Sequence, residues 1–322
     1  MATPTAIYQT YNQVGIREDL SDIIYDISPM DTIFFTRAAR STATNTLTDW
    51  QTDALAAASA TNAFIEGDDF SGQAVTATTK LRNYAQISRK DVVVSRSANK
   101  ANTAGRKQEL AYQLVKKGKE LKRDIESACL QNKAATAGSS ASGRVAASVE
   151  TWIHTANHVP AASQTTCTTP APVSGIAGTA GTDGSSTALV EATLKSGLQQ
   201  AWSCGGEVDT ILLPAGLKAT VDAFTGIATR FRNVAANAQA DIVAAADVYV
   251  SDFGAHKLVL SRYMRSTVVL GLDFNTWGLA WFDPIKSVPI AQSGDSEKVM
   301  LVGEWSVVAK SPTANFKHTA QA

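Results

Sequence analysis

Residues 103–132 read TAGRKQELAYQLVKKGKELKRDIESACLQN, and this stretch sets the framework for the rest of the chain. Its apolar side chains recur at helical spacing and form a single stripe. The stripe comprises Leu110, Leu114, Leu121, Ile125 and Cys129. At 1.5 Å per residue, a helix of this length would span about 45 Å, far more than an average globular helix. The sequence therefore predicts one long amphipathic helix around which the other elements are arranged.

The remaining faces of this helix carry charges of both signs. Lys116 and Lys122 are interleaved with Glu120 and Asp124. Opposite charges three or four residues apart pair on a helix surface, so we expect a solvated face. A strip that binds nucleic acid is the alternative. Gly118 costs the helix about 1 kcal/mol relative to alanine and indicates a close contact or a slight bend.

An extended polar segment precedes the helix over residues 41–88. Residues 46–51 alternate polar and apolar side chains, and residues 80–88 form a second run that can pair with them. The turn-rich residues 66–72 lie between the two runs. An isolated two-stranded ribbon is marginally stable in water, and this one has few large apolar side chains. We therefore expect a long hairpin-like projection that needs support from another surface.

Residues 1–40 have the character of an N-terminal arm. A short apolar stripe at helical spacing ends at Ser28-Pro29, because the residue before a proline disfavours helix. The stripe contains Ile16, Leu20, Ile23, Ile24 and Ile27. A short helix cannot bury such a stripe by itself. The arm should therefore lie against the body of its own subunit or against a neighbour.

The second half of the chain mixes helices and strands. Residues 145–153 fit a short helix between two loops rich in glycine and serine, and residues 187–225 read as helix, strand and helix. From residue 240 onward, strands dominate. They are expected at 248–250, 257–260, 267–272, 298–302 and 305–309, the first two forming a hairpin around a turn at 251–255. Helix runs followed by strand runs indicate the α+β class.

Length, charge and hydropathy restrict the function. A chain of 322 residues can form two packed units. Its 29 basic side chains balance 29 acidic ones, and affinity for nucleic acid comes largely from cations that neutralise phosphates. Tight binding of a polynucleotide is therefore not expected, although the protein could enclose one. No apolar run approaches the ~20 residues that cross a bilayer, and the N-terminus lacks the features of a signal peptide, so we expect a soluble cytosolic chain without a membrane partner.

No recognisable motif for catalysis or metal binding accompanies this layout. His154 and His158 are four residues apart, but they lack the glutamate of an HExxH helix, so surface histidines are the better interpretation. The glycine-rich residues 175–186 lack the Gly-Lys-Ser/Thr of a phosphate loop. The three cysteines form no CxxC pair and are expected to be reduced thiols: Cys129, Cys167 and Cys204. We therefore predict no catalytic residue, no cofactor-binding residue, no metal site and no cofactor.

Several stretches, taken in order along the chain, carry a family resemblance. The first is the opening block Tyr11-Asn12-Gln13-Val14-Gly15-Ile16-Arg17-Glu18-Asp19-Leu20. Gln86-Ile87-Ser88-Arg89 then leads into the long helix, and Val248-Tyr249-Val250-Ser251-Asp252-Phe253-Gly254 forms the hairpin. The last two are Ser293-Gly294-Asp295-Ser296-Glu297-Lys298 and Gly303-Glu304-Trp305-Ser306-Val307. Over nearly its whole length the chain resembles tailed-phage major capsid proteins of the Hong Kong 97-type fold.

The resemblance implies a division into parts. Residues 1–40 would be the N-terminal arm and residues 41–88 the extended β-hairpin loop, which lies over an adjacent subunit. Residues 89–187 would form the peripheral domain, with the long spine helix and flexible glycine-rich segments. Residues 188–265 would form the axial domain, and residues 266–322 the closing strands that return to the peripheral domain.

The resemblance also implies a function and partners. The protein would assemble as pentamers and hexamers into an icosahedral head shell around double-stranded phage DNA, without reading its sequence. Assembly would take place in the host cytoplasm with scaffolding and portal proteins. Because the arm begins almost at Met1, we expect any scaffold to be a separate protein. Some relatives carry a lysine–asparagine crosslink, but no matching motif is visible around Lys80. The contacts expected between subunits involve Ile16, Leu20, Ile23, Trp50, Phe64, Glu66 and Asp68.

Other functions remain open from the sequence. An encapsulin-like compartment would share the fold and hold cargo enzymes. An enzyme, such as a hydrolase that uses His154 or His256, is a third class. A tail or decoration protein would usually show fibre repeats, and none is visible in this sequence.

Overall fold

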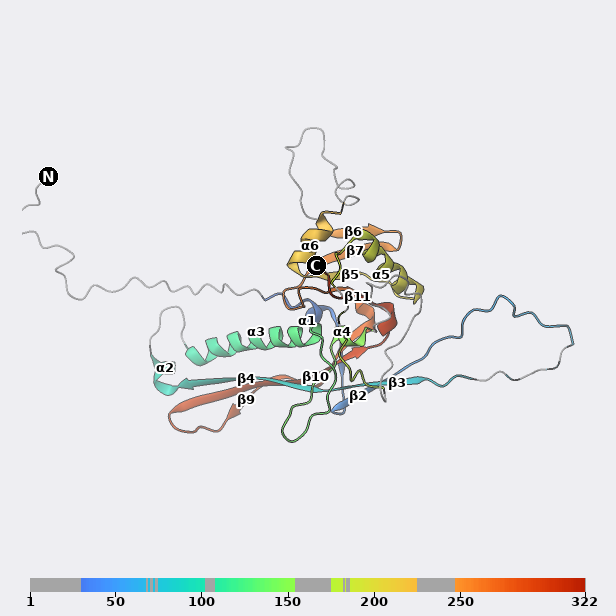
Figure 1. Cartoon of the computed structure of the whole chain (residues 1–322). Helices are drawn as coiled ribbons and strands as arrows, with labels where there is room; N and C mark the ends of the chain where they lie inside the picture. The colour runs from blue at the N-terminus through green and yellow to red at the C-terminus, as the bar shows by residue number, and fades with distance from the viewer. Residues whose placement is uncertain are drawn as a thin grey trace, which may run out of the picture.

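A computed structural model describes residues 30–67, 69, 72, 75–101, 108–153, 175–181, 183, 186–224 and 247–321. A four-stranded sheet, a five-stranded sheet and the long helix α3 (Glu109–Leu130) make up the body, and a loop extends far beyond it (Figure 1). The mixture of helices and sheets agrees with the expected α+β class.

A four-stranded sheet forms the base of the molecule. Its order is β1 (Ala39–Thr42), β9 (Trp277–Ile290), β10 (Ser296–Ala309) and β4 (Gln86–Ser95). The β1 strand runs parallel to β9, and the other pairs are antiparallel. Strands at 298–302 and 305–309 are in fact one long strand, β10, whose register shifts near Gly303. Its partner β9 is a strand that the sequence did not reveal.

The long helix packs on this sheet. It runs over Glu109–Leu130, about 33 Å at 1.5 Å per residue, and is therefore shorter than predicted. Leu121, Ile125 and Cys129 of the predicted stripe are fully buried, whereas Leu110 and Leu114 are half-buried. The C-terminal half of the helix therefore carries most of the packing. A short helix, α2 (Arg96–Lys100), follows β4 and begins with a cap from the Ser95 hydroxyl.

Two short helices pack against α3: α1 (Ile33–Arg37) and α4 (Val149–Trp152). Both carboxylate oxygens of the buried Glu126 accept N–H groups at the start of α1, from Phe34 at 2.8 Å and from Phe35 at 2.7 Å. Burial raises the pKa of Glu126, while these backbone donors act in the opposite direction. The first described helix is thus fixed to the spine by one side chain.

A five-stranded sheet forms the second unit. Its order is β11 (Phe316–His318), β8 (Val269–Leu272), β5 (Thr210–Leu213), β7 (Gly254–Leu260) and β6 (Val248–Ser251). Only β5 and β7 are parallel in this sheet. Helices α5 (Glu191–Ser203) and α6 (Ala215–Asp222) accompany it, as the helix–strand–helix pattern predicted. The 3₁₀ turns η3 (Phe274–Thr276) and η4 (Pro312–Ala314) lie where the chain moves between the two sheets.

The closing segment 266–322 is therefore shared between the two units. Its long strands β9 and β10 join β4, whereas β8 and β11 belong to the five-stranded sheet. We expected the whole segment to return to the peripheral domain, but β8 and β11 do not. The apolar strand β8 pairs with the fully buried strand β5 of the five-stranded sheet before the chain crosses to the four-stranded sheet as β9.

The cysteines differ from one another. Cys129 is a free, fully buried thiol, and burial raises its pKa well above the ordinary value. Cys204 is disulfide-bonded, so the expectation of reduced thiols is wrong at that position. No spacing motif marks Cys204 in the sequence, which is why the bond was not foreseen. Cys167 lies outside the described residues.

Candidate assembly surface

The predicted projection begins as a ribbon of β2 (Leu47–Thr52) and β3 (Thr79–Tyr84), paired antiparallel as expected. The Trp50 indole N–H donates to the carbonyl oxygen of Ala309 at 2.9 Å, and its ring lies 5.3 Å from that of Trp152. Leu81 is fully buried. The base of the ribbon is thus supported by its own chain, and the expectation that it needs another surface is wrong for this part.

Asn83 fixes the ribbon to the body through a buried amide. Its side-chain NH₂ group donates to the carbonyl oxygen of Val307 at 2.8 Å and of Ala147 at 3.2 Å. Its carbonyl oxygen accepts the backbone N–H of Ala147 at 2.9 Å. A buried amide satisfied in this way holds one geometry, because any shift would leave a polar group without a partner.

Beyond the ribbon, the chain continues as a loop of residues 53–78 that extends away from both sheets (Figure 1). Every described residue of this loop is exposed. Four of them are large apolar side chains with high exposed fractions: Leu55 at 100 %, Val75 at 97 %, Ile65 at 82 % and Phe64 at 70 %. The loop also contains four acidic residues and no lysine, arginine or histidine. Exposed apolar groups of this kind mark an interaction surface.

The predicted contact residues occupy different places. Phe64 and Glu66 lie on the exposed loop, whereas Trp50 packs inside its own chain. Four others lie outside the described residues: Ile16, Leu20, Ile23 and Asp68. The role of all seven in contacts between subunits stays a prediction.

A groove lies where α1, β1 and β9 meet the side of α3. It has a volume of about 560 Å³, and Phe35, Trp281 and Ile285 supply much of its apolar lining. Phe35 and Trp281 meet edge to face with ring centroids 6.1 Å apart. The two cations in the lining are Arg40 and Lys122, and no acidic residue is part of it. The groove is therefore apolar at its floor and positive at its rim.

One of these two cations contacts an aromatic ring of the groove. The Arg40 guanidinium lies 5.3 Å from the centroid of the Phe35 ring, a cation–π contact. In the part of the chain that the structure describes, neither Arg40 nor Lys122 forms an ion pair. The groove also follows an open sheet edge, because β1 pairs with β9 only at residues 278–281. Sequence reasoning missed this surface, since it did not recognise β9.

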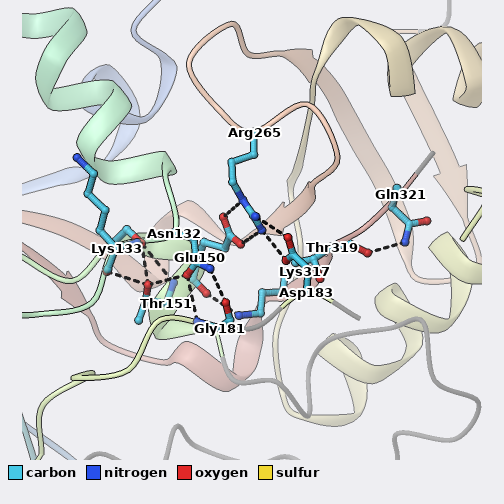
Figure 2. Close-up of polar contacts among 11 residues, drawn as sticks. Asn132, Lys133, Glu150, Thr151, Gly181, Asp183, Arg265, Lys317, Thr319 and Gln321 are labelled. Carbon is cyan, nitrogen blue, oxygen red and sulfur yellow. Dashed lines mark hydrogen bonds and ion pairs between the residues drawn. The ribbon is translucent and has the colours of Figure 1, made fainter. Parts of the chain in front are cut away.

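A second polar site lies at the junction of the two sheets (Figure 2). Figure 2 shows the Arg265 guanidinium between two carboxylates. It donates to Glu150 at 2.5 and 3.2 Å and to Asp183 at 2.6 and 2.8 Å. The Lys317 ammonium donates to the main-chain oxygen of Glu150 at 2.7 Å. We call Glu150, Asp183, Arg265 and Lys317 the junction network.

The junction network joins elements of both units. Glu150 belongs to α4, which packs against the spine helix, whereas Lys317 belongs to β11 and Arg265 to the connection between β7 and β8. Burial raises the pKa of Glu150, which Arg265 counteracts, and burial lowers the pKa of Lys317 to about 8. Hydrogen bonds to Asp183 and Glu150 raise the pKa of Arg265. Sequence reasoning missed this network, because its members are far apart in the chain.

The candidates for chemistry have structural roles or cannot be placed. His256 is buried, and its ring nitrogens lie 2.6 Å from the carbonyl oxygen of Val208 and 2.7 Å from the Ser251 hydroxyl, so it does have partners. Burial lowers the pKa of His256 and favours the neutral ring. His154 and His158 lie outside the described residues. Among the residues described, no cluster of three metal-ligating side chains occurs, and no helix is long and apolar enough to span a bilayer.

Comparisons with known proteins agree with this geometry. Residues 3–320 match the family described as SU10 major capsid protein. A segment of 136 residues is 40 % identical to the major capsid protein of Escherichia phage Phieco32. That segment covers 42 % of this chain and 38 % of the relative, so the match spans well under half of the relative's length.

Solved structures share the fold at low sequence identity. The capsid asymmetric unit of Cyanophage A-1(L) has a TM-score of 0.68 and 10 % identity, and the match covers 97 % of this chain and 98 % of that one. A chain of Gordonia phage Cozz has a TM-score of 0.58 and 11 % identity, with 95 % and 92 % covered. These likenesses show that the whole described chain has the Hong Kong 97-type fold.

Proposed function

Because this chain belongs to the family of SU10 major capsid proteins, we propose that copies of it assemble into the icosahedral head shell of a tailed phage, around double-stranded DNA. The family consists of structural proteins rather than enzymes. The observation that carries the proposal is the exposed loop of residues 53–78. Its apolar side chains are rooted on a rigid ribbon but find no partner on the described part of their own chain.

The physical argument is one of many weak contacts. Leaving Leu55, Phe64 and Ile65 in water forgoes about 1.5–3 kcal/mol each, which burial against a neighbour would recover. A loop that binds a different surface on the next copy makes a heterologous contact, and such contacts close into rings when the rotation closes. Pentamers and hexamers are the rings that an icosahedral shell requires. Repetition of contacts worth a few kcal/mol each then stabilises the whole shell.

The two units support the proposed division of labour. We assign the four-stranded sheet and α3 to the peripheral domain, and the five-stranded sheet with α5 and α6 to the axial domain around the five- and six-fold axes. Residues 1–40 would serve as the arm and residues 41–88 as the extended loop. In this assignment the peripheral domain covers residues 89–187, the axial domain 188–265 and the closing strands 266–322, with β8 and β11 as the parts that cross over.

The proposed partners follow from charge and family. A formal net charge of +0 is compatible with a shell protein that encloses DNA without binding it in a sequence-specific way. Scaffolding and portal proteins would direct assembly in the host cytoplasm. The relatives found are phage capsid proteins, which favours a phage head over an encapsulin-like compartment.

The loop can be removed without touching the core. Thr52 pairs with Thr79, so Asn-Gly can replace residues 53–78 as a two-residue hairpin turn. We expect this variant to keep the circular dichroism spectrum and melting temperature of the unassembled subunit, but to form no shells in negative-stain electron microscopy. A wider deletion would not be a fair test, because Leu81, Asn83 and Ala85 are buried.

A second variant keeps the loop length and changes Leu55, Phe64, Ile65 and Val75 to serine. This variant should also fail to form shells, since it lacks the apolar groups that the contact requires. Normal particles from the hairpin variant would show that the loop is dispensable, and the proposal would then lose the observation on which it depends.

A further inference from the structure

We propose that the groove between α1, β1 and β9 of one subunit binds the loop tip of a second copy, with Phe64 and Ile65 on its floor and Glu66 between Arg40 and Lys122. This inference rests on the proposed function, because it names the partner surface of the loop. It adds a docking site and a pairing of opposite charges, which together determine where on the neighbouring subunit the loop binds.

The apolar parts of the two surfaces are complementary. Phe64 and Ile65 are adjacent in sequence and largely exposed at the loop tip. The groove offers the half-buried Trp281 and Ile285, beside the buried ring of Phe35. Its volume of about 560 Å³ lies in the range of pockets that hold several side chains. An aromatic side chain placed there would meet rings at edge or offset geometry.

The charges are complementary as well. Glu66 is exposed and forms no ion pair within the described residues. Asp68 and Asp69 follow it, so three acidic residues occur within four positions, and the whole loop has no cation. The groove has the reverse composition, because its lining holds no acid and two cations that form no ion pair within the described residues. Opposite potentials of this kind guide encounter and fix the register of a contact.

The loop of the same chain does not occupy the groove. All described residues of 53–78 are exposed, and Figure 1 shows the loop leaving the body at the end opposite α2. Folded as two extended arms of about 13 residues, the loop can reach at most about 45 Å from the ribbon. That reach is comparable to the length of α3 and is sufficient to cross onto an adjacent copy.

A charge exchange tests the pairing. The groove variant carries Arg40→Glu and Lys122→Glu, and the loop variant carries Glu66→Lys and Asp69→Lys. Either variant alone should lower the yield of particles by about tenfold or more. Like charges would repel each other at every loop–groove contact, and the shell contains many copies of this contact. The combined variant, in which positive tips meet negative grooves, should recover to within about threefold of wild type. The readout is particle yield by sedimentation and electron microscopy at equal subunit concentration.

Lys116→Glu provides the matched control, because Lys116 lies on the same helix as Lys122 but does not line the groove. It should assemble as wild type does. Equal melting temperatures of all unassembled subunits would exclude misfolding. If the wild type forms no particles, the proposed function itself fails. If the wild type assembles and the groove variant does so equally well, the groove is not the docking site. If the groove variant forms few particles and the exchange does not restore the yield, another segment, such as the N-terminal arm, binds there and the proposal is overturned.

Discussion

At the residue scale, Lys317 is the most unusual charge in the molecule. It is 2 % exposed, and burial lowers its pKa from 10.5 to about 8. Its ammonium donates to the main-chain oxygen of Glu150, whereas the Glu150 and Asp183 carboxylates are bound to Arg265. Glu150 and Asp183 favour the charged lysine and Arg265 opposes it, but desolvation is the largest effect. The folded subunit therefore holds this proton less tightly than the unfolded chain does.

This difference gives stability a defined pH dependence. Between pH 8 and 10.5 the unfolded chain binds more protons at Lys317 than the folded subunit, so stability rises with pH across that interval. Below pH 8 the buried charge lowers stability by a constant amount. Relative to Lys317→Met, the free energy of unfolding of wild type should increase by about 3 kcal/mol over the interval. Urea unfolding of the unassembled subunit at several pH values measures it.

Lys195→Met is the control for this comparison. Lys195 is an exposed lysine paired with Glu191 on α5, so this variant shows the effect of replacing a lysine that is not buried. The difference in free energy of unfolding between wild type and Lys317→Met could instead stay constant from pH 7.5 to 10.5. That result would mean that burial does not lower the pKa of Lys317.

At the element scale, two glycines show how differently the same residue can be used. Gly271 of β8 lies against β11, and a Cβ atom there would come within 2.0 Å of the Phe316 ring. In α3, by contrast, a Cβ on Gly118 would meet nothing within 4 Å among the described residues. The close contact that the sequence suggested at Gly118 is therefore not made within the described subunit, whereas the slight bend stays a prediction.

Alanine substitutions at these positions should have opposite effects. Gly271→Ala should destabilise the unassembled subunit by about 1–3 kcal/mol through overpacking against Phe316. Gly118→Ala should stabilise it by up to about 1 kcal/mol, because alanine is the better helix former. Denaturant unfolding of the two variants beside wild type gives both values. A neutral Gly271→Ala would show that β11 moves away easily, and a destabilised Gly118→Ala would reveal a contact that the described residues do not include.

The elements also show what the sequence could and could not predict. The spine helix and the hairpin of β6 and β7 follow from periodicity and turn residues, which are local signals. The β9 strand was missed because Pro284 and Pro289 interrupt its apolar pattern, and prolines argue against a strand. The prolines are tolerated here because, among the described residues, no strand pairs with the outer side of β9 beyond Trp281. The groove on that side was missed with it, while the loop could be predicted from its composition.

The junction network could not be predicted for a different reason. Glu150, Asp183, Arg265 and Lys317 are single charges separated by tens of residues, and no spacing rule connects them. Only the tertiary fold brings them together, when α4, β11 and the connection after β7 meet. Local patterns fixed the type of most elements, whereas the contacts between units depended on long-range packing.

At the scale of the whole molecule, the chain passes between the two units several times. It leaves the four-stranded sheet after β4, forms β5 to β8, returns as β9 and β10, and ends in β11 of the five-stranded sheet. The two hydrophobic cores are therefore tied by covalent crossings and by the junction network. Neither unit can unfold without disturbing β8, β11 or their connections, so we expect the unassembled subunit to unfold in one cooperative transition.

Arg265→Met tests this coupling. The substitution leaves Glu150 buried at 1 % exposure without its cation, and loss of one partner of a buried charge pair typically costs about 3–5 kcal/mol. Because the lost contact bridges the two units, calorimetry should show a lower melting temperature and a transition that broadens or divides. Arg262→Met is the control, since Arg262 pairs with Asp31 at an exposed site and its loss should change little. If Arg265→Met melts in a single sharp transition at the wild-type temperature, the junction network contributes nothing to cooperativity. The chain connections between the two sheets would then couple the units by themselves.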